Sequence, residues 1–527
     1  MSKAQVLSLN IMLLPVLARI LASDHTIAGL LLLFGLVTRL PFQSHILYSW
    51  DSVNFAYAIR EFNIAKEQPQ PPGYIIYVWL IQAVDAVVRD AQTTMVSLSI
   101  LASALAAVAL FYLGRALFDR RIGILAALFL ATSPLFWFYG EIALPHTLDM
   151  LLLIVSVWWF YETQRGDYHY LYPAVAVVAI AGGVRQQTLV FLAPLILFSL
   201  LRVGWRRFIV AGLIGGVICA TWFVPLIALS GGLKNYLNTM NAFADRFQAT
   251  TSLLQGAGWF GIQRNVIKLT LYTLYGWGLP ILTALGFAFV KIRRPKWSKP
   301  GQETLFSVWW AAPAVLFYIF IHMGQQGLVF VYLPVLLLIS AVGLVRLLGS
   351  HLRWLNVATA ALLAMNASIF CLAPEFPLGP HTQRLLTRAT LTNSDHYFGD
   401  RFDVIRENFP PASTIILAGN WHHVEYYLPQ YKRLAFNVGS KWEVDAGTAT
   451  NTNLLLLAAT PSELGLQLDA NNQASVVIFD NVLLAFNQPS VQVKHLMLAN
   501  DDALAYMVLR AGDQLILNAD SYTFITK

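Results

Sequence analysis

The sequence predicts an α-helical protein that crosses a membrane many times and ends in a small α/β domain. Of its 527 residues, 57% are hydrophobic and only 12% are charged, whereas a soluble domain has about 25% charged residues. So few charged residues cannot cover a globule, and most of the chain must therefore face lipid. The second observation is that long apolar runs end near residue 374, where short β-rich segments take over.

Apolar stretches close to the roughly 17–25 residues that a membrane span needs occur eleven times before residue 374. They cover 26–42, 93–113, 122–138, 144–161, 170–184, 187–203, 208–230, 267–290, 304–321, 327–345 and 355–373. Residues 73–88 form a further apolar stretch, which opens with Pro71-Pro72-Gly73. This opening suits an elbow better than the middle of a membrane helix.

Basic residues decide the sidedness of the chain. They cluster at 115–121, 202–207, 291–296 and 346–353, as cytoplasmic loops do. All four clusters share one side only if 73–88 does not span, so we expect 73–88 to be a re-entrant or interfacial outer helix. The N-terminus is then cytoplasmic, with residues 1–25 as an uncleaved interfacial segment and 26–374 as the transmembrane domain.

The tail, residues 375–527, is predicted to be a small extracytoplasmic α/β domain. A helix-like stretch at 400–408 precedes segments with β character, namely Thr414–Ala418, Asn453–Ala458, Ser475–Asp480 and Ala505–Leu517. The net charge of +7 follows from the basic loops of a membrane protein, so we expect no nucleic-acid partner. No Walker A motif or dinucleotide-binding glycine loop is present in the sequence.

Ionisable and strongly polar residues gather in the turns assigned to the outer face. They are Asp51 in the first loop, Glu141 and His146 with Asp149 in the second, Arg185 in the third, Arg264 and Lys268 in the fourth, and His322 and Gln325 in the fifth. Such residues next to a bilayer are costly and mark sites of chemistry or transport. Arginine can bind a phosphate with two N–H donors, and a carboxylate can accept a proton from a hydroxyl nucleophile.

Five motifs in this order resemble the bacterial integral-membrane glycosyltransferases of the GT-C class, a family 39-like group that includes the protein O-mannosyltransferases and the aminoarabinose transferase of lipid A. They are Trp50-Asp51-Ser52-Val53-Asn54-Phe55-Ala56, the elbow Pro71-Pro72-Gly73-Tyr74, Ser133 to Glu141, Gly182-Gly183-Val184-Arg185, and His322-Met323-Gly324-Gln325-Gln326-Gly327. The resemblance runs through residues 26–345 and adds only a variable outer domain for the tail.

The resemblance implies transfer of a monosaccharide from a polyprenyl-phosphate-linked donor to an acceptor hydroxyl, with inversion, at the outer face of the bacterial inner membrane. Asp51 would be the general base. Glu141 would be the second acidic residue of the catalytic site, orienting the acceptor or a divalent ion, and is favoured over Asp149 because it should sit at the water interface. Arg185 would stabilise the departing phosphate. The remaining candidates would hold the donor phosphate or sugar (His322, Gln325, Tyr74, Lys268) or the acceptor or a metal (His146, Asp149).

Several alternatives stay open at this point. A transporter or flippase of a lipid-linked sugar would also need polar residues in the membrane, although no internal repeat of the kind common in transporters is evident. The acceptor is a glycan, a glycolipid or a protein. No cofactor is certain and a divalent metal stays open, since carboxylates and imidazole can ligate one but the chain has no compact spacing such as His-x-x-x-His.

Overall fold

The computed structural model describes residues 23–293, 301–378, 384–435 and 454–527, apart from 461, 469–472, 490, 500–501, 519 and 522. The chain divides into two compact units. The helical unit comprises residues 1–45 and 54–391, and the tail unit comprises residues 46–53 and 392–527. The division near residue 391 lies beyond the domain boundary predicted at 374, and no sequence pattern predicted that 46–53 belongs to the tail unit.

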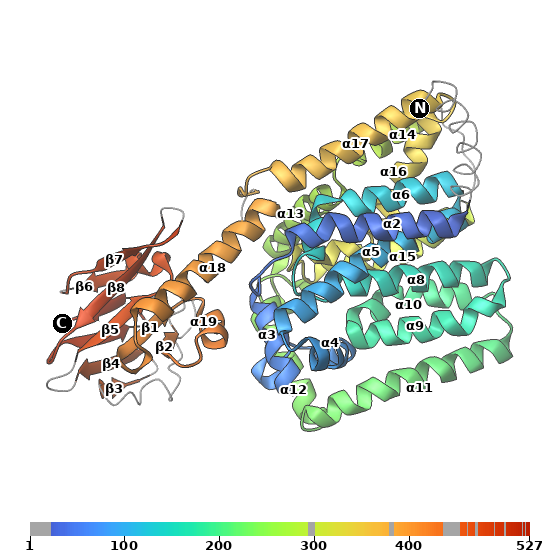
Figure 1. Cartoon of the computed structure of the whole chain (residues 1–527). Helices are drawn as coiled ribbons and strands as arrows, with labels where there is room; N and C mark the ends of the chain where they lie inside the picture. Colours follow the sequence, from blue (N-terminus) through green and yellow to red (C-terminus); the bar gives the residue numbers. More distant parts are fainter. Residues whose placement is uncertain are drawn as a thin grey trace, which may run out of the picture. The chain divides into compact units, whose positions relative to one another are not determined.

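The described part of the helical unit consists mainly of α-helices (Figure 1). They are α2 Asp24–Arg39, α3 Trp50–Arg60 (whose first residues belong to the tail unit), α4 Ile75–Val88, α5 Ala91–Leu117, α6 Arg120–Thr132, α7 Pro134–Gly140, α8 His146–Gln164, α9 Leu171–Val184, α10 Gln186–Leu200, α11 Trp205–Leu229, α12 Leu233–Gln248, α13 Gly258–Trp277, α14 Ile281–Arg293, α15 Gln302–Phe320, α16 Leu333–Leu348 and α17 Leu352–Leu372.

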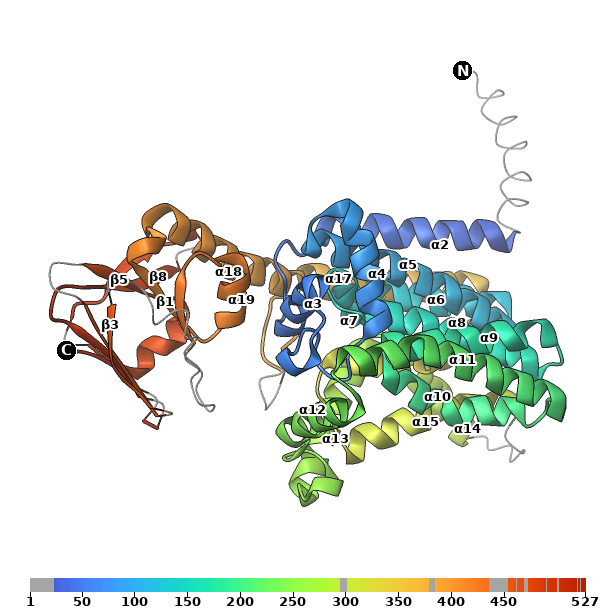
Figure 2. The ribbon, with the colours of Figure 1, turned by 90° about the horizontal axis from the view of Figure 1, so that it is seen from below.

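Helix α5 lies at the centre of this unit, where it packs against α2, α6 and α8. Helices α8, α9 and α11 then lie side by side, as Figures 1 and 2 both show. The crossing of α5 and α6 depends on a glycine, because a Cβ on Gly123 would lie 2.4 Å from the carbonyl oxygen of Phe111. Small residues at such crossings let two helix backbones approach closely.

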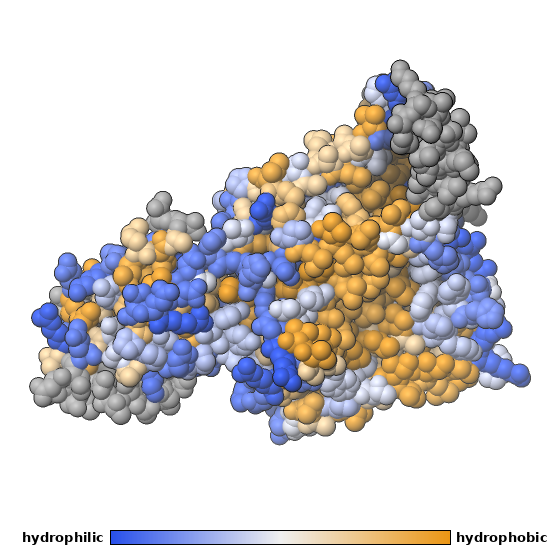
Figure 3. All heavy atoms as spheres, viewed as in Figure 1, coloured by the Kyte–Doolittle hydropathy of each residue, from blue (hydrophilic) through white to orange (hydrophobic). Residues whose placement is uncertain are grey.

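The surface of the helical unit suits a membrane. Five of its described helices are long and apolar enough to span, or seven if each of two bent pairs counts once. Figure 3 shows apolar residues across the middle of the bundle and polar residues toward the helix ends. Shorter apolar helices cover Ile75–Val88, Tyr168–Val184, Gln186–Leu200 and Leu333–Leu348, so the count of eleven spans stays a prediction.

Helix α4, which covers most of the predicted non-spanning stretch, has 14 residues. At a rise of about 1.5 Å per residue it is roughly 21 Å long, less than the roughly 30 Å of a hydrocarbon core. Helices α9, α10 and α16, which lie in predicted spans, have only 14 to 16 residues as well, so length does not separate α4 from them and the non-spanning stretch stays a prediction.

The predicted span 267–290 is not a single straight helix. The chain forms α13 and α14, which meet at an angle of 102°. Between them Gly278 has a φ of +64°, and Pro280 cannot donate a backbone hydrogen bond. The predicted span 122–138 is also bent, by 65°, because Ser133 caps a new helix that begins at Pro134.

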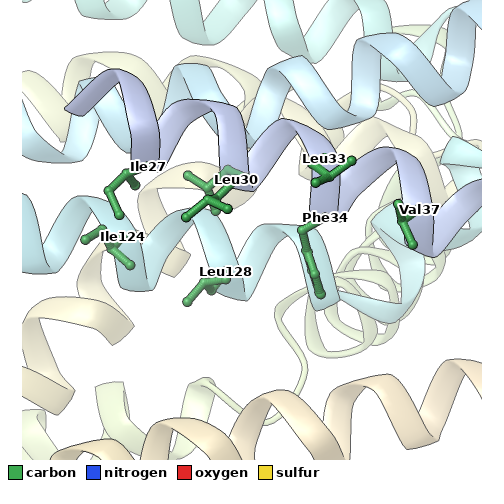
Figure 4. A pocket seen from close by; sticks show the side chains of 8 residues that line it. Ile27, Leu30, Leu33, Phe34, Val37, Ile124 and Leu128 are labelled. Atoms are coloured by element: carbon green, nitrogen blue, oxygen red, sulfur yellow. The ribbon is translucent and has the colours of Figure 1, made fainter. Parts of the chain in front are cut away.

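An open groove between α2 and α6 is lined only by apolar side chains (Figure 4). Leu30, Leu33 and Val37 of α2 expose about half or more of their surface there. Exposure of this kind is costly in water but carries no such cost against lipid tails. The groove therefore supports the placement of α2 and α6 in the hydrocarbon region.

The described residues of the tail unit after 391 form two α-helices and two sheets. Its elements are α18 Arg388–Asn408 (which begins in the helical unit), β1 Thr414–Ala418, α19 Trp421–Tyr427, β2 Lys432–Ala435, β3 Leu454–Ala459, β4 Glu463–Leu468, β5 Ala474–Ile478, β6 Asn487–Pro489, β7 Lys494–Met497, β8 Ala503–Leu509, β9 Gln514–Asn518 and β10 Thr523–Thr526. The helix expected at 400–408 begins twelve residues earlier, and a turn at 510–513 divides the strand expected at 505–517.

The tail unit has three layers. In the first sheet the strand order is β2-β1-β5-β8-β7, with β1 parallel to both β2 and β5. Ile416 and Ala418 of β1 face α18 and α19, whereas Ile415 and Leu417 face the second sheet, of order β3-β4-β9-β10-β6. Strand β1 is fully buried because both of its faces are covered.

Candidate functional site

The elbow before α4 is fixed to the start of α10 by hydrogen bonds. Gly73 has a φ of +114°, and a Cβ there would lie 2.6 Å from Leu226 of α11, so glycine is required on two counts. The Gln186 amide donates to the Pro72 carbonyl at 3.2 Å, and the Tyr236 hydroxyl lies 3.1 Å from the Gln186 amide oxygen. The elbow therefore lies next to the residue that follows Arg185.

Arg185 lies between α9 and α10 and forms a buried ion pair with Asp149. Its Nη1 is 3.5 Å from Asp149 Oδ2, and the two side chains are 7% and 4% exposed. The Thr188 hydroxyl donates to the other carboxylate oxygen at 2.5 Å. Among the described residues Arg185 Nε has no partner, so a guanidinium with five N–H groups keeps donors available for a ligand.

Two tyrosines complete this group, which we call the Arg185 cluster (Tyr74, Asp149, Arg185, Thr188 and Tyr318). Tyr74 and Tyr318 are close enough to Arg185 to interact electrostatically. Tyr74 comes from the elbow and Tyr318 from the last turn of α15. The cluster thus joins the second and fourth sequence motifs to the helix that leads into the fifth.

His146 opens α8 and lies against the fifth motif. Its ring contacts Tyr139 with centroids 4.9 Å apart, and a Cβ on Gly327 would lie 2.5 Å from the His146 ring. His146 is within electrostatic range of Arg185. Asp149, the other candidate for an acceptor or metal site, has both carboxylate oxygens engaged by Thr188 and Arg185.

A second group, the Arg264 cluster, consists of Arg264, Lys268 and His322. Arg264 and Lys268 are four residues apart on α13 and so lie on one face of the helix. His322 follows α15, and both cations interact with its imidazole. No ion pair that the described residues form includes Arg264 or Lys268. Positive groups gathered without a carboxylate fit an anionic ligand.

Asn265 fixes the geometry of the Arg264 cluster. Its buried amide donates to the carbonyl oxygens of Thr251 and Ile319, at 3.0 and 3.2 Å, and accepts from the Met323 N–H at 3.1 Å. His322 Nδ1 lies 3.0 Å from the Thr251 hydroxyl. Gln325, also expected in the donor site, is exposed and precedes a 3₁₀ turn over Gln326–Val331.

His322 should make the stability of the protein depend on pH. Burial, and then the charges of Arg264 and Lys268, lower its pKa to about 4, from 6.5 in the unfolded chain. Between these values the unfolded chain binds more protons, so the free energy of unfolding should fall as pH drops from about 6.5 to about 4. Thermal unfolding of the detergent-solubilised protein across this range measures the slope. The variant His322→Gln should flatten it, and an unchanged slope in that variant would contradict the assignment.

Glu141 does not lie at a water interface, and that expectation is wrong. Its side chain is fully buried at the end of α7, and neither carboxylate oxygen has a hydrogen-bond partner among the described residues. The nearest opposite charge in electrostatic range is Arg39, itself fully buried. The bend at Pro134 explains the burial of Glu141, because it turns α7 so that this helix packs against α5, α13 and α17.

Asp51 lies in the first turn of α3, in the part of the chain that belongs to the tail unit. Ser49 precedes the helix, and its hydroxyl oxygen accepts from the Ser52 N–H at 3.2 Å, as an N-cap does. A carboxylate in the first turn is favoured by the helix dipole. Asp51 is partly exposed, whereas Glu141 and Asp149 are buried.

Within the described part of the chain, no three His, Cys, Asp or Glu side chains lie close enough together to hold a metal ion.

Sequence reasoning did not assign Arg39, Thr188 or Tyr318 to the site, and it noted Arg264 without giving it a role. A signal was available for Thr188, three residues after Arg185, and for Arg264, one helical turn before Lys268. Arg39 and Tyr318 carry no comparable signal, because they are distant in sequence from Glu141 and Arg185 and meet them only through the packing of separate helices.

Comparison with known proteins agrees with this geometry. Residues 69–229 match the family described as dolichyl-phosphate-mannose-protein mannosyltransferase. This match covers less than half of the chain, but it includes the elbow, Glu141, Asp149 and Arg185. A comparison with curated proteins gives no match.

Solved structures extend the likeness to nearly the whole chain. ArnT from Cupriavidus metallidurans bound to undecaprenyl phosphate superimposes with a TM-score of 0.58 at 13% identity, covering 92% of this chain and 97% of ArnT. Its apo form gives 0.57 over the same shares. The archaeal oligosaccharyltransferase AglB from Archaeoglobus fulgidus gives 0.47 at 12% identity, over 78% and 64%. The predicted resemblance to integral-membrane glycosyltransferases is confirmed, and the chain has the ArnT fold.

Proposed function

We propose that the protein is a glycosyltransferase that moves a monosaccharide from a polyprenyl-phosphate-linked donor to an acceptor hydroxyl, with inversion. The observation that carries this proposal is the Arg264 cluster, in a chain that shares its fold with an ArnT structure containing undecaprenyl phosphate. By the basic-loop pattern, the reaction takes place at the outer face of a bacterial inner membrane, where the tail unit is also located.

In this mechanism the Asp51 carboxylate accepts the proton of the acceptor hydroxyl as its oxygen attacks the anomeric carbon. The bond from that carbon to the phosphate oxygen breaks, and the polyprenyl phosphate leaves with its electron pair. Lys268, Arg264 and the free donors of Arg185 stabilise the negative charge that develops on the phosphate. His322, neutral near pH 7 because its pKa is lowered to about 4, contributes a hydrogen bond rather than a charge.

The buried carboxylates have supporting roles in this proposal. Asp149 orients Arg185, which it contacts directly, while Tyr74 and Gln325 line the donor site. Glu141 acts through Arg39, whereas His146 faces the acceptor. The acceptor is a glycan, a glycolipid or a protein, all of which present hydroxyl groups.

Product analysis separates this function from the alternative, a flippase or transporter of the lipid-linked sugar. Purified protein is incubated with a polyprenyl-phosphate sugar and a membrane extract as acceptor source, and free polyprenyl phosphate is measured by mass spectrometry. A transferase releases polyprenyl phosphate as the sugar moves to an acceptor. A flippase leaves the donor intact. If no polyprenyl phosphate is released in the presence of extracts from cells that contain the protein, the proposal is contradicted.

Removing the cations of the Arg264 cluster should weaken donor binding. A hydrogen bond to a charged group contributes about 1.5–3 kcal/mol, so Lys268→Ala and Arg264→Ala should each raise the Kd for polyprenyl phosphate about 10- to 100-fold. Binding to protein in nanodiscs measures this effect. Lys234→Ala is the matched control, because Lys234 on α12 is exposed and lies in the same predicted outer loop. Equal affinities in all three variants would remove the cluster from the site.

A further inference from the structure

Residues 46–53, which carry Asp51, pack with the tail unit although 338 residues of the helical unit, 54–391, separate the two in sequence. The Leu47 side chain is fully buried. Ile46 packs against the apolar core that α18 and α19 form with the first sheet. The segment is thus held by residues that the chain reaches only near its end.

Hydrogen bonds from side chains of α18 and α19 bind the backbone of this segment. The Ile46 N–H donates to Asp395 Oδ1 of α18 at 3.0 Å. The Leu47 N–H donates to the Tyr427 hydroxyl at 2.9 Å, and the Leu47 carbonyl lies 2.9 Å from His423 Nε2. Both backbone polar groups of Leu47 therefore find their partners on α19.

His423 is built to donate this hydrogen bond. It is 3% exposed, and its ring stacks on Phe398 with centroids 4.3 Å apart and an interplanar angle of 13°. Burial lowers its pKa to about 4, so the ring is neutral near pH 7. A neutral imidazole carries one N–H, and an Nε2 facing a carbonyl oxygen must be the nitrogen that carries it.

Side chains of α19 also hold the first residue of α3. The Trp50 ring stacks on His422 with centroids 4.5 Å apart and an interplanar angle of 20°, and meets Trp421 edge-on at 5.1 Å. Stacked and edge-on aromatic rings attract each other beyond the effect of area burial. Trp50 is the direct neighbour of Asp51. Helix α19 therefore contacts both the Leu47 backbone before α3 and the Trp50 side chain at the start of α3.

We propose that α19 is a positioning element for Asp51, in which His423 and Tyr427 fix the backbone at Leu47 and Trp421 and His422 fix Trp50. Together these contacts set the direction of the first turn of α3, which carries the carboxylate. The inference rests on the proposed function, in which Asp51 is the general base. It gives the tail unit a role in catalysis without contact between α19 and any substrate.

The test uses the full-length protein and two variants that each remove one hydrogen bond, Tyr427→Phe and His423→Phe. The matched control is Tyr431→Phe, because the Tyr431 hydroxyl also donates to backbone carbonyls within the tail unit, but to those of Ile405 and Phe409 and not to residues 46–53. Hydrogen–deuterium exchange at the Leu47 amide should be roughly 3- to 10-fold faster in Tyr427→Phe, since such a bond contributes about 0.5–1.5 kcal/mol. Exchange in Tyr431→Phe should match the wild type.

Kinetics complete the test. A small displacement of a catalytic group can cost up to about 100-fold, so kcat should fall about 10-fold or more in both variants while KM for the donor stays unchanged. Unchanged exchange would overturn the proposal, and so would faster exchange with an unchanged kcat. If Asp51→Asn retains full activity, the proposed function fails instead, whereas the exchange result still reports whether α19 holds the segment.

Discussion

Replacing Asp51 by asparagine should reduce sugar transfer about 10²- to 10⁴-fold, the range that general-base catalysis contributes. Asparagine keeps the size of the side chain but cannot accept the proton of the acceptor hydroxyl. The fold should survive, because the lost attraction between the carboxylate and the helix dipole is only about 0.3–1 kcal/mol. The measurement is kcat with a purified polyprenyl-phosphate sugar donor, alongside the thermal midpoint of the detergent-solubilised variant.

Glu61→Gln provides the control for this experiment. Glu61 follows the same helix, its side chain is 56% exposed, and it pairs with Lys66 at 2.8 Å. Loss of this exposed carboxylate should leave turnover unchanged. Wild-type turnover in Asp51→Asn would exclude Asp51 as the base, whereas equal losses in both variants would point to a general effect of charge in this region.

Replacing Arg185 by alanine should destabilise the protein by about 3–5 kcal/mol, because it leaves the buried Asp149 carboxylate without its partner. The expected result is a lower thermal midpoint together with weaker binding of polyprenyl phosphate. Arg165→Ala is the matched control. Arg165 pairs with Glu162 at 3.4 Å, but its side chain is 54% exposed, and exposed pairs contribute about 0–1 kcal/mol.

A double variant separates the two roles of Arg185. Arg185→Met with Asp149→Leu removes both charges, and replacing a buried pair by apolar residues is often neutral for stability. The double variant should therefore recover much of the thermal midpoint but not the affinity for polyprenyl phosphate. Recovered affinity would show that Arg185 serves stability alone, and the donor-binding role would then be rejected.

The membrane-protein class and most helices follow from the sequence because apolar composition and length determine them directly. The sequence did not reveal where helices bend. At Ser133-Pro134 and Gly278–Pro280 the local breaking signals are present, but the apolar character continues through both, and hydropathy alone predicts continuous spans. The error over Glu141 follows from the first of these bends, since a straight helix would have brought its end to the interface.

Site residues could be predicted where the local sequence makes them stand out, and not where only contacts between distant elements bring them together. Arg185 and Lys268 stand out as cations beside apolar runs, and the structure places each in a cluster of polar residues. The partition of these residues into two clusters was not predictable, because it depends on contacts between distant elements. The amide of Asn265, for example, ties α13 to the turn after α15.

The bonds to Leu47 have a consequence for the order of synthesis. His423 follows Leu47 by 376 residues. A ribosome adds about 5–20 residues per second, so roughly 20–75 s pass between the synthesis of Leu47 and that of His423. Through that interval the Leu47 N–H and C=O lack the partners they have in the finished protein, while the helices between are being made. A ribosome that stops before α19 would thus leave a complete set of membrane helices whose first polar segment has nothing to dock on.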